Sequence, residues 1–210
     1  MGQITTGVRS MLDNPFIYNF SQVFFGGGIL KTRKWNTAFV SNFVRPQSGA
    51  QILDIGCGPA EILAYLSGVS YWGFDISPAY IRWAQKKYGT AGHFFCKELI
   101  SEDLESLPKF DITLAIAVLH HLDDATAASL VELAHKSLKP GGRLITVDAC
   151  FIPKQNPIAR CLISWDRGQN VRTLEGYTAL VSKMFPEHHI EIRHQSWIPY
   201  TYCFMECIRT

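Results

Sequence analysis

A short glycine loop is the part of the sequence that most clearly predicts a ligand. The segment Leu53–Gly58 contains Gly56 and Gly58, which allow a ligand to approach the backbone closely. Asp54 stands just before the turn, where its carboxylate would repel a pyrophosphate and favour a cationic group. Glu61 occupies the place where a dinucleotide-binding loop normally has its third glycine. The loop therefore favours a cationic ligand over a dinucleotide, unless Asp54 simply caps the turn.

Two further acids follow the next two apolar stretches. Asp75 can accept hydrogen bonds from both hydroxyls of a ribose, and its alternative role as a helix cap is weaker because Ser77 can serve there. Glu98 could accept from an adenine amino group, although Glu102 and Asp103 are close enough to compete. A ligand that combines adenine, ribose and a cationic end without phosphate is S-adenosylmethionine. We therefore expect this compound as the cofactor.

An alternation of strands and helices must position these residues. Ser77-Pro78 begins a helix, because serine can cap it and proline fits the first turn. Continuous apolar runs such as Ile112–Leu119 predict strands covered on both faces, hence a mainly parallel sheet with helices on each side. A helix stop and tight turn are expected at 139–142, and Pro199 separates the strands of a terminal antiparallel hairpin. The expected strands are 51–55, 71–75, 93–96, 111–118, 143–149, 189–195 and 200–208, and the expected helices are 61–67, 78–88 and 125–138.

The motifs in this order resemble those of a known superfamily. Ile52–Pro59 is similar to the first motif of the class I S-adenosylmethionine-dependent methyltransferases, and Gly73–Ser77 to their acidic second-strand motif. Phe110-Asp111, Val118–Leu122 and Leu138–Gly142 are similar to later motifs of the same superfamily. The resemblance implies an α/β, three-layer Rossmann-like fold with a seven-stranded, mostly parallel sheet in the order 3-2-1-4-5-7-6. Strand seven would be antiparallel, and a helical cap would precede the sheet.

The same resemblance implies a set of cofactor-binding residues. Asp54 and Gly56 would face the methionine end, Asp75 the ribose, and Ile76 with the pair Glu98-Leu99 the adenine. The segment 115–117 would lie on the sulfonium side. Glu98 departs from the family, which more usually has aspartate there. The full set is Asp54, Gly56, Cys57, Gly58, Asp75, Ile76, Glu98, Leu99, Ala115 and Ala117.

One of two adjacent histidines could accept a proton, and an aspartate near them could orient an acceptor hydroxyl. His120 and His121 follow the fourth predicted strand, where the carboxyl ends of parallel strands form a ligand crevice, and Asp148 ends the fifth. Methyl transfer to a hydroxyl or amine needs a nucleophile held in line and a proton acceptor, and histidine can accept a proton at neutral pH. We predict His121, His120 and Asp148 as catalytic residues. The alternative is that His121 only packs against its loop or bonds to backbone.

The stretch between the fifth strand and the hairpin predicts a polar acceptor. Residues 166–172 hold two arginines, an acid and two amides, and the resemblance implies that this connection helps to build the acceptor pocket. A salt-bridged surface loop is the alternative. The aromatic cluster at 16–25, beside three glycines, suits a lid, or a helix packed permanently on the core. The predicted substrate residues are Tyr18, Asp166, Arg167, Arg172 and Tyr177.

Composition excludes several classes of protein. With 47% hydrophobic and 18% charged residues, the 210 residues suit one globular domain with a cap at 1–48, a cofactor core at 50–150 and a substrate segment at 151–210. A net charge of +2 and the lack of an arginine-rich run argue against a nucleic-acid partner. The six cysteines have no zinc spacing, so no metal is expected. No apolar stretch is long enough for a membrane span and no signal sequence is recognisable, which predicts a cytoplasmic location.

Together these features predict an enzyme that transfers a methyl group from S-adenosyl-L-methionine to an oxygen or nitrogen of a polar small molecule. A non-catalytic S-adenosylmethionine-binding regulatory or partner subunit with the same fold is the alternative. Asp54 and Glu61 argue against a nicotinamide-dependent oxidoreductase, because they do not suit a pyrophosphate.

Overall fold

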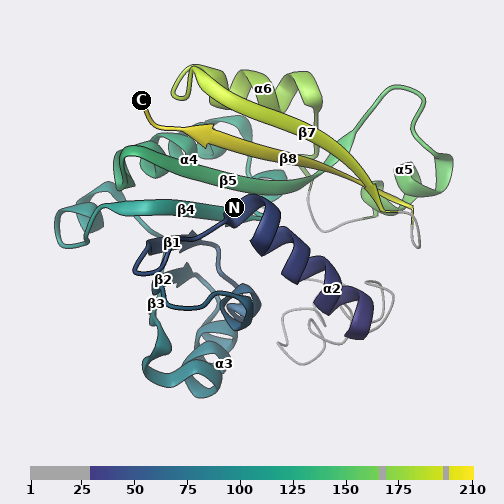
Figure 1. Cartoon of the computed structure of the whole chain (residues 1–210). Helices are drawn as coiled ribbons and strands as arrows, with labels where there is room; N and C mark the ends of the chain where they lie inside the picture. The colour runs from purple at the N-terminus through teal and green to yellow at the C-terminus, as the bar shows by residue number, and fades with distance from the viewer. Residues whose placement is uncertain (1–28, 166–168, 196–198) are drawn as a thin grey trace. The chain divides into compact units, whose positions relative to one another are not determined.

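The computed structural model describes residues 29–165, 169–195 and 199–210, which divide into two compact units. The N-terminal unit contains the described residues up to Ile112, and the C-terminal unit begins at Thr113. The strand order is β3-β2-β1-β4-β5-β8-β7 (Figure 1), and β4 (Phe110–Ile116) crosses the boundary between the units. The Rossmann-like α/β fold and the predicted strand order are confirmed. The division of a single domain into cap, core and substrate segment stays a prediction.

The N-terminal unit contains three parallel strands: β1 (Gln51–Ile55), β2 (Ser70–Asp75) and β3 (His93–Cys96). Helix α3 (Pro78–Tyr88) contacts β2 and β3, and Figure 1 shows these elements together. Its start follows the prediction, because the Ser77 hydroxyl accepts the Tyr80 N–H and proline takes the first position. Helix α2 (Ile29–Phe39) continues into the π-helix η2 (Val40–Val44).

One predicted helix of this unit has a different form. Residues 61–67 were expected to be an α-helix, but η3 (Glu61–Tyr65) is a short 3-10 helix. Its N-cap, Ala60, has a left-handed backbone with φ 56° and no side-chain capping bond. Without a cap, and with only five residues, this segment takes the tighter 3-10 form that is common in short connectors. Two further 3-10 helices complete the unit, η4 (Gly89–Ala91) and η5 (Ser101–Glu105).

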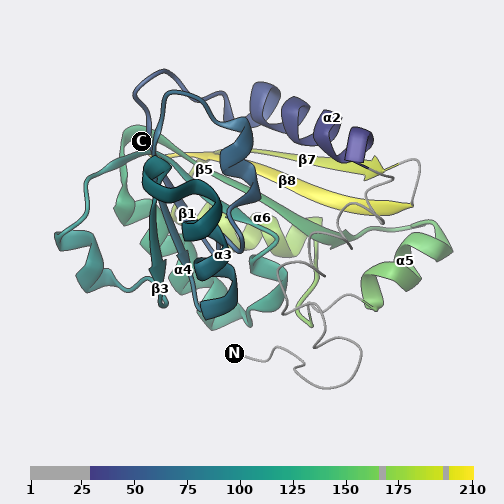
Figure 2. The same cartoon turned by 90° about the horizontal axis from the view of Figure 1, so that it is seen from below.

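The C-terminal unit contains an antiparallel group of long strands. β8 (Tyr200–Ile208) pairs with both β5 (Leu138–Phe151) and β7 (Glu187–Gln195), and Figure 1 shows the three side by side. The predicted terminal hairpin is thus present. A two-residue strand that was not predicted, β6 (Arg172–Thr173), pairs with the end of β5. The other elements of this unit are η6 (Leu119–His121), α4 (Asp124–Ser137), α5 (Pro157–Ser164) and α6 (Leu174–Ser182). Figure 2 shows α5 near the end of this unit at which β8 begins.

The predicted turn at 139–142 is wrong. β5 begins at Leu138, immediately after α4, and continues through both glycines. The Gly141 N–H donates to the Arg209 carbonyl at 2.7 Å, and the Arg209 N–H donates to the Gly142 carbonyl at 2.9 Å. Gly141 has φ +75°, which glycine adopts without strain. Both glycines therefore belong to a paired strand and not to a turn.

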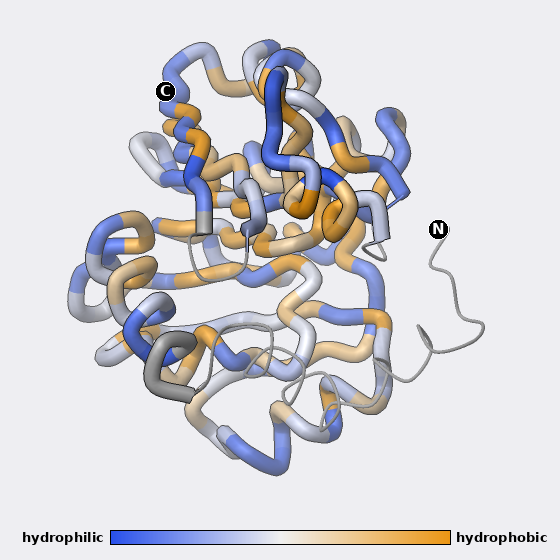
Figure 3. The backbone as a smooth tube through the Cα atoms, turned by 90° about the vertical axis from the view of Figure 1, so that its right-hand side faces the viewer, coloured by the Kyte–Doolittle hydropathy of each residue, from blue (hydrophilic) through white to orange (hydrophobic). Residues whose placement is uncertain are grey.

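Strands β1 and β5 are buried along most of their length. In β1, the residues from Ile52 to Ile55 are all buried, and in β5 the residues from Leu144 to Cys150 are buried. In Figure 3, where the backbone is coloured by hydropathy, hydrophobic and hydrophilic stretches alternate along the chain. Among the described helices, none is long and apolar enough to cross a membrane.

Candidate active site

The glycine loop of the N-terminal unit turns sharply after β1. Gly56 and Gly58 have left-handed backbones with φ +71° and +54°. The N–H groups of Gly56 and Cys57 both donate to the carbonyl of Phe74, at 2.8 and 3.0 Å, and so attach the loop to β2. A Cβ added at Gly58 would meet no protein atom within 4 Å. Gly58 is therefore explained by its backbone conformation and by open space that a ligand can enter, and not by packing.

Asp75 joins this loop to the start of α3. Its Oδ2 accepts the Gly58 N–H at 2.9 Å, and its Oδ1 accepts the Ser77 N–H at 2.7 Å. Burial raises the pKa of this carboxyl, and the two backbone hydrogen bonds oppose that rise. Each carboxylate oxygen has two lone pairs, so both can still accept from a ligand hydroxyl. The predicted ribose anchor thus also orders the glycine loop.

Asp54, near the end of β1, is a buried acid. Its Oδ2 accepts the hydroxyl of Tyr71, another buried residue, at 2.5 Å. Burial raises the pKa of Asp54 to about 7; the hydrogen bond from Tyr71 opposes the rise, and the charge of Asp75 adds to it. Asp54 is therefore not the permanent anion that the sequence suggested. A cationic group placed beside it would favour its ionised form.

β2 and β3 are neighbouring parallel strands, and Asp75 at the end of β2 is paired with Cys96 at the end of β3. The loops that follow these two strands therefore begin side by side. Ile76, after β2, is 50% exposed, and Glu98, after β3, is exposed as well, whereas Leu99 is buried. The competing acid Asp103 is already engaged, since it accepts the Ile100 N–H at 3.1 Å and forms an ion pair with Lys97. Of the acids that could accept from the adenine amino group, Asp103 thus bonds within its own loop, whereas the carboxylate of Glu98 is exposed.

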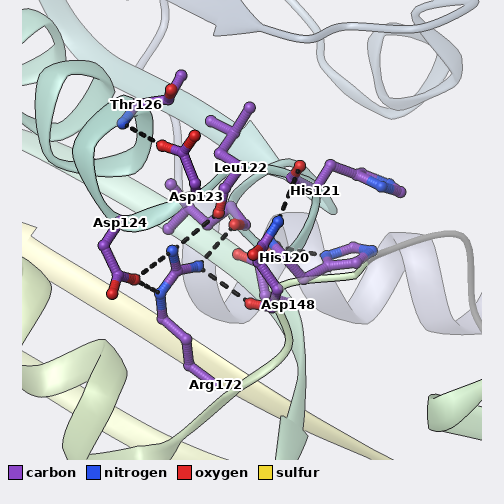
Figure 4. Close-up of polar contacts among 10 residues, drawn as sticks. His120, His121, Leu122, Asp123, Asp124, Thr126, Asp148 and Arg172 are labelled. Atoms are coloured by element: carbon purple, nitrogen blue, oxygen red, sulfur yellow. Dashed lines mark hydrogen bonds and ion pairs between the residues drawn. The ribbon is translucent and has the colours of Figure 1, made fainter. Parts of the chain in front are cut away.

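The C-terminal unit brings two of the predicted catalytic residues into contact. The Nδ1 atom of His120 lies 2.8 Å from Oδ1 of Asp148, and the His120 backbone N–H donates to the same oxygen at 3.2 Å (Figure 4). Both side chains are buried. The other Asp148 oxygen, Oδ2, is buried without a hydrogen-bond partner among the described residues. His121 is half-buried, and its ring centroid lies 4.2 Å from that of His120.

A strained residue precedes the two histidines. Ala117 has φ +57°, an uncommon conformation for a residue with a Cβ, and its N–H donates to the Val147 carbonyl at 2.7 Å. It is exposed, whereas Ala115 in β4 is buried. Backbone strain of this kind collects at functional sites, which agrees with the cofactor role predicted for Ala117.

Two predicted substrate residues have bonding partners within the protein. Arg172 donates to three backbone carbonyls and to the carboxylate of Asp124. Tyr177 is fully buried and donates its hydroxyl to the Ala149 carbonyl at 2.9 Å. Burial, with the charge of Asp148 adding to it, raises the pKa of Tyr177 far above its usual value. These contacts favour structural roles for both residues, and their roles toward a substrate stay predictions.

Comparisons with known proteins agree with the fold and the motifs. A family model described as a methyltransferase domain matches residues 53–144. An O-methyltransferase of Pyrenophora dematioidea is 31% identical over 162 residues, which cover 69% of this chain and 60% of that protein. The chain belongs to the class I S-adenosylmethionine-dependent methyltransferase superfamily. It spans 38–60% of the length of the curated relatives that it matches.

Two solved methyltransferase structures have the same fold as this superfamily member. A TehB-like S-adenosylmethionine-dependent methyltransferase from Corynebacterium glutamicum has a TM-score of 0.63 at 16% identity, over 96% of this chain and all of that one. Phosphoethanolamine N-methyltransferase 2 of Haemonchus contortus, solved with S-adenosyl-L-methionine, has a TM-score of 0.71 at 15% identity. That match covers all of this chain and 61% of the other.

Three predicted substrate residues of this superfamily member lie outside the described part of the chain, and two residues that contact the site were not singled out from the sequence. The predicted substrate residues Tyr18, Asp166 and Arg167 lie outside the described residues. Tyr71, which donates to Asp54, was not predicted, since a tyrosine in a strand carries no sign of its partner. Asn170 was noted only as part of a polar segment, yet its backbone N–H donates to the His120 carbonyl at 2.9 Å.

Proposed function

We propose that this chain binds S-adenosylmethionine on the loop Leu53–Gly58 and transfers its methyl group to an oxygen or nitrogen of a polar small molecule. The observation that carries the proposal is the pair of bonds made by Asp75, which hold the Gly58 N–H and the start of α3. They order a glycine loop beside open space and leave lone pairs for two hydroxyls. The family membership and the relatives named above support the same reaction class.

Each polar group of the N-terminal unit would hold one part of the cofactor. Asp75 would accept the ribose hydroxyls, and the exposed Ile76 would cover one face of the adenine. Glu98 would accept from the adenine amino group. Asp54 would become ionised beside the cofactor's ammonium group, since a nearby cation stabilises a carboxylate. When bound, S-adenosylmethionine supplies a methyl group that its sulfonium makes electrophilic.

The C-terminal unit offers a proton acceptor. Asp148 holds Nδ1 of His120, which fixes the orientation of the ring and would stabilise its protonated form. A histidine held in this way can accept the proton of a hydroxyl or amine as it is methylated. His121, which is half-buried, is the second candidate base. Whichever histidine accepts the proton, we propose that the His120–Asp148 pair controls the protonation state of the histidines at this site.

Binding and turnover test the proposal separately. Calorimetric titration with S-adenosylhomocysteine should show one site in the wild-type chain, and Asp75→Asn should weaken it at least about tenfold, because hydrogen bonds to a charged acceptor contribute about 1.5–3 kcal/mol each. Asp103→Asn is the matched control, since it removes a carboxyl that holds its own loop. Wild-type affinity in Asp75→Asn would remove Asp75 from the ribose site.

Turnover needs an acceptor, which a screen of polar hydroxyl and amine metabolites can find by release of S-adenosylhomocysteine. Turnover on a member of that panel, lost in His120→Gln or His121→Gln, is the expected result. Tight cofactor binding without turnover on any compound would instead favour a non-catalytic subunit. No binding of S-adenosylhomocysteine at all would overturn the proposal.

A further inference from the structure

The side chain of Arg172 connects three elements of the C-terminal unit. Its Nη1 donates to the Leu119 carbonyl and its Nη2 to the Leu122 carbonyl, both at 2.8 Å. Its Nε and Nη2 donate to Oδ1 of Asp124, in the first turn of α4, at 3.0 and 2.8 Å. His120 and His121 lie between the two bonded carbonyls. Arg172 therefore holds the backbone on either side of the histidines, as Figure 4 shows.

The guanidinium has no N–H group left for a substrate. Arginine has five N–H donors, and here Nε uses one, Nη1 two and Nη2 two. The remaining Nη1 bond goes to the Asn170 carbonyl at 3.1 Å. The side chain is only 9% exposed. An acceptor anion could bind Arg172 only by displacing one of these bonds.

The stem of Arg172 lies against a glycine of α6. A Cβ added at Gly176 would come within 3.2 Å of the Arg172 Cβ and 3.6 Å of its Cγ. The Gly176 N–H donates to the hydroxyl of Thr173, which caps α6. The first turn of α6 thus leaves room for the arginine, which favours one fixed path for its side chain.

We propose that Arg172 is a positioning residue, which holds the Leu119–Leu122 turn so that His120 stays on Asp148, and not a substrate-binding residue. Asn170 supports the same turn, because its backbone N–H donates to the His120 carbonyl. The effect on catalysis rests on the proposed function, whereas the effect on the histidine does not. The two can therefore be tested apart.

The first test measures the histidine ring without any substrate. Ring nitrogen NMR shifts are followed from pH 5 to 9 in the wild type, in Arg172→Ala and in Arg172→Lys. Arg143→Ala is the matched control, since it removes another partly buried ion pair of this unit, with Glu206. We expect the His120 midpoint to move by about half a pH unit or more in both Arg172 variants and to stay in place in the control. A wild-type His120 titration in Arg172→Ala would overturn the proposal.

The second test uses kinetics on an acceptor found by the screen. Arg172→Ala should lower kcat by about 100-fold, as expected when a catalytic group is displaced, while KM for the acceptor and the affinity for S-adenosylhomocysteine stay unchanged. Lysine keeps the charge but lacks the planar fork of donors, so Arg172→Lys should fail as well. Added guanidinium should restore part of kcat in Arg172→Ala alone. A raised acceptor KM with unchanged kcat, or full activity in the lysine variant, would instead make Arg172 a substrate-binding cation.

Thermal unfolding shows whether the variants fold. If Arg172→Ala does not fold, Asp124→Asn is compared with the wild type in its place. This substitution removes the charge of only one partner of Arg172, and the same shift of the His120 midpoint is expected. A wild-type His120 titration in Asp124→Asn and in Arg172→Lys would then overturn the proposal. If no acceptor is ever turned over, the proposed function fails, and the NMR titration still decides the positioning role.

Discussion

The buried carboxyl of Asp54 makes the free energy of unfolding depend on pH in a range where most aspartates do not titrate. Its pKa is about 7 in the folded chain and near 3.8 in an unfolded one, because burial disfavours the charge more than the hydrogen bond from Tyr71 favours it. Between these two values the folded state binds more protons than the unfolded state. Stability therefore falls as pH rises through this window, and levels off above pH 7.

The size of the effect follows from the two pKa values. Between pH 5 and pH 8 the contribution of Asp54 to the free energy of unfolding drops by about 2.5 kcal/mol. In Asp54→Asn the side chain is neutral at every pH, and its amide oxygen can still accept the Tyr71 hydroxyl. The free energy of unfolding of the variant, measured relative to that of the wild type at the same pH, should therefore rise by about 2.5 kcal/mol from pH 5 to pH 8.

Urea unfolding at one-unit steps from pH 5 to 8, followed by tryptophan fluorescence, measures this difference. Other titrating groups, Asp75 among them, are present in both proteins and cancel to first order. Asp103→Asn is the control, because the hydrogen bond from Lys97 lowers the pKa of Asp103 and its titration falls below this range. That variant should keep the wild-type pH dependence. A wild-type slope in Asp54→Asn would refute the assignment of the raised pKa to Asp54.

Three further variants test single contacts. Gly58→Ala should cost about 1 kcal/mol by thermal unfolding, because φ +54° disfavours a Cβ, and should lose S-adenosylhomocysteine binding in calorimetry; a variant that binds normally would place the ligand elsewhere. Asp148→Asn should lower kcat about 100-fold with unchanged S-adenosylhomocysteine affinity, and unchanged kcat would exclude the His120–Asp148 pair from proton transfer. Tyr177→Phe should lose about 1 kcal/mol of stability with the bond to Ala149, and a raised acceptor KM at wild-type stability would restore its predicted substrate role.

Much of the fold could be predicted because its signals are local. The strand Gln51–Ile55 and the strand His93–Cys96 have the predicted bounds, since an apolar run between turn residues needs no distant information. The helix start at Ser77-Pro78 depends on two residues only. The helix end predicted before 139–142 is confirmed, since α4 ends at Ser137. The tight turn predicted there is wrong, because the local pattern does not contain the pairing with Arg209, which keeps these glycines in a strand.

The candidate site, like the fold, depends partly on local sequence signals and partly on contacts between distant residues. From the order of its motifs, the sequence by itself determined the family, the glycine loop and the position of Asp75. Only the tertiary structure decided the state of each group. Burial raises the pKa of Asp54 to about 7 although Tyr71 donates a hydrogen bond to it, and Arg172 uses its donors on the turn that carries the histidines. The physical reason is that burial and hydrogen bonding join residues far apart in the chain. A residue type states what a side chain can donate or accept, but its partner is set by the fold.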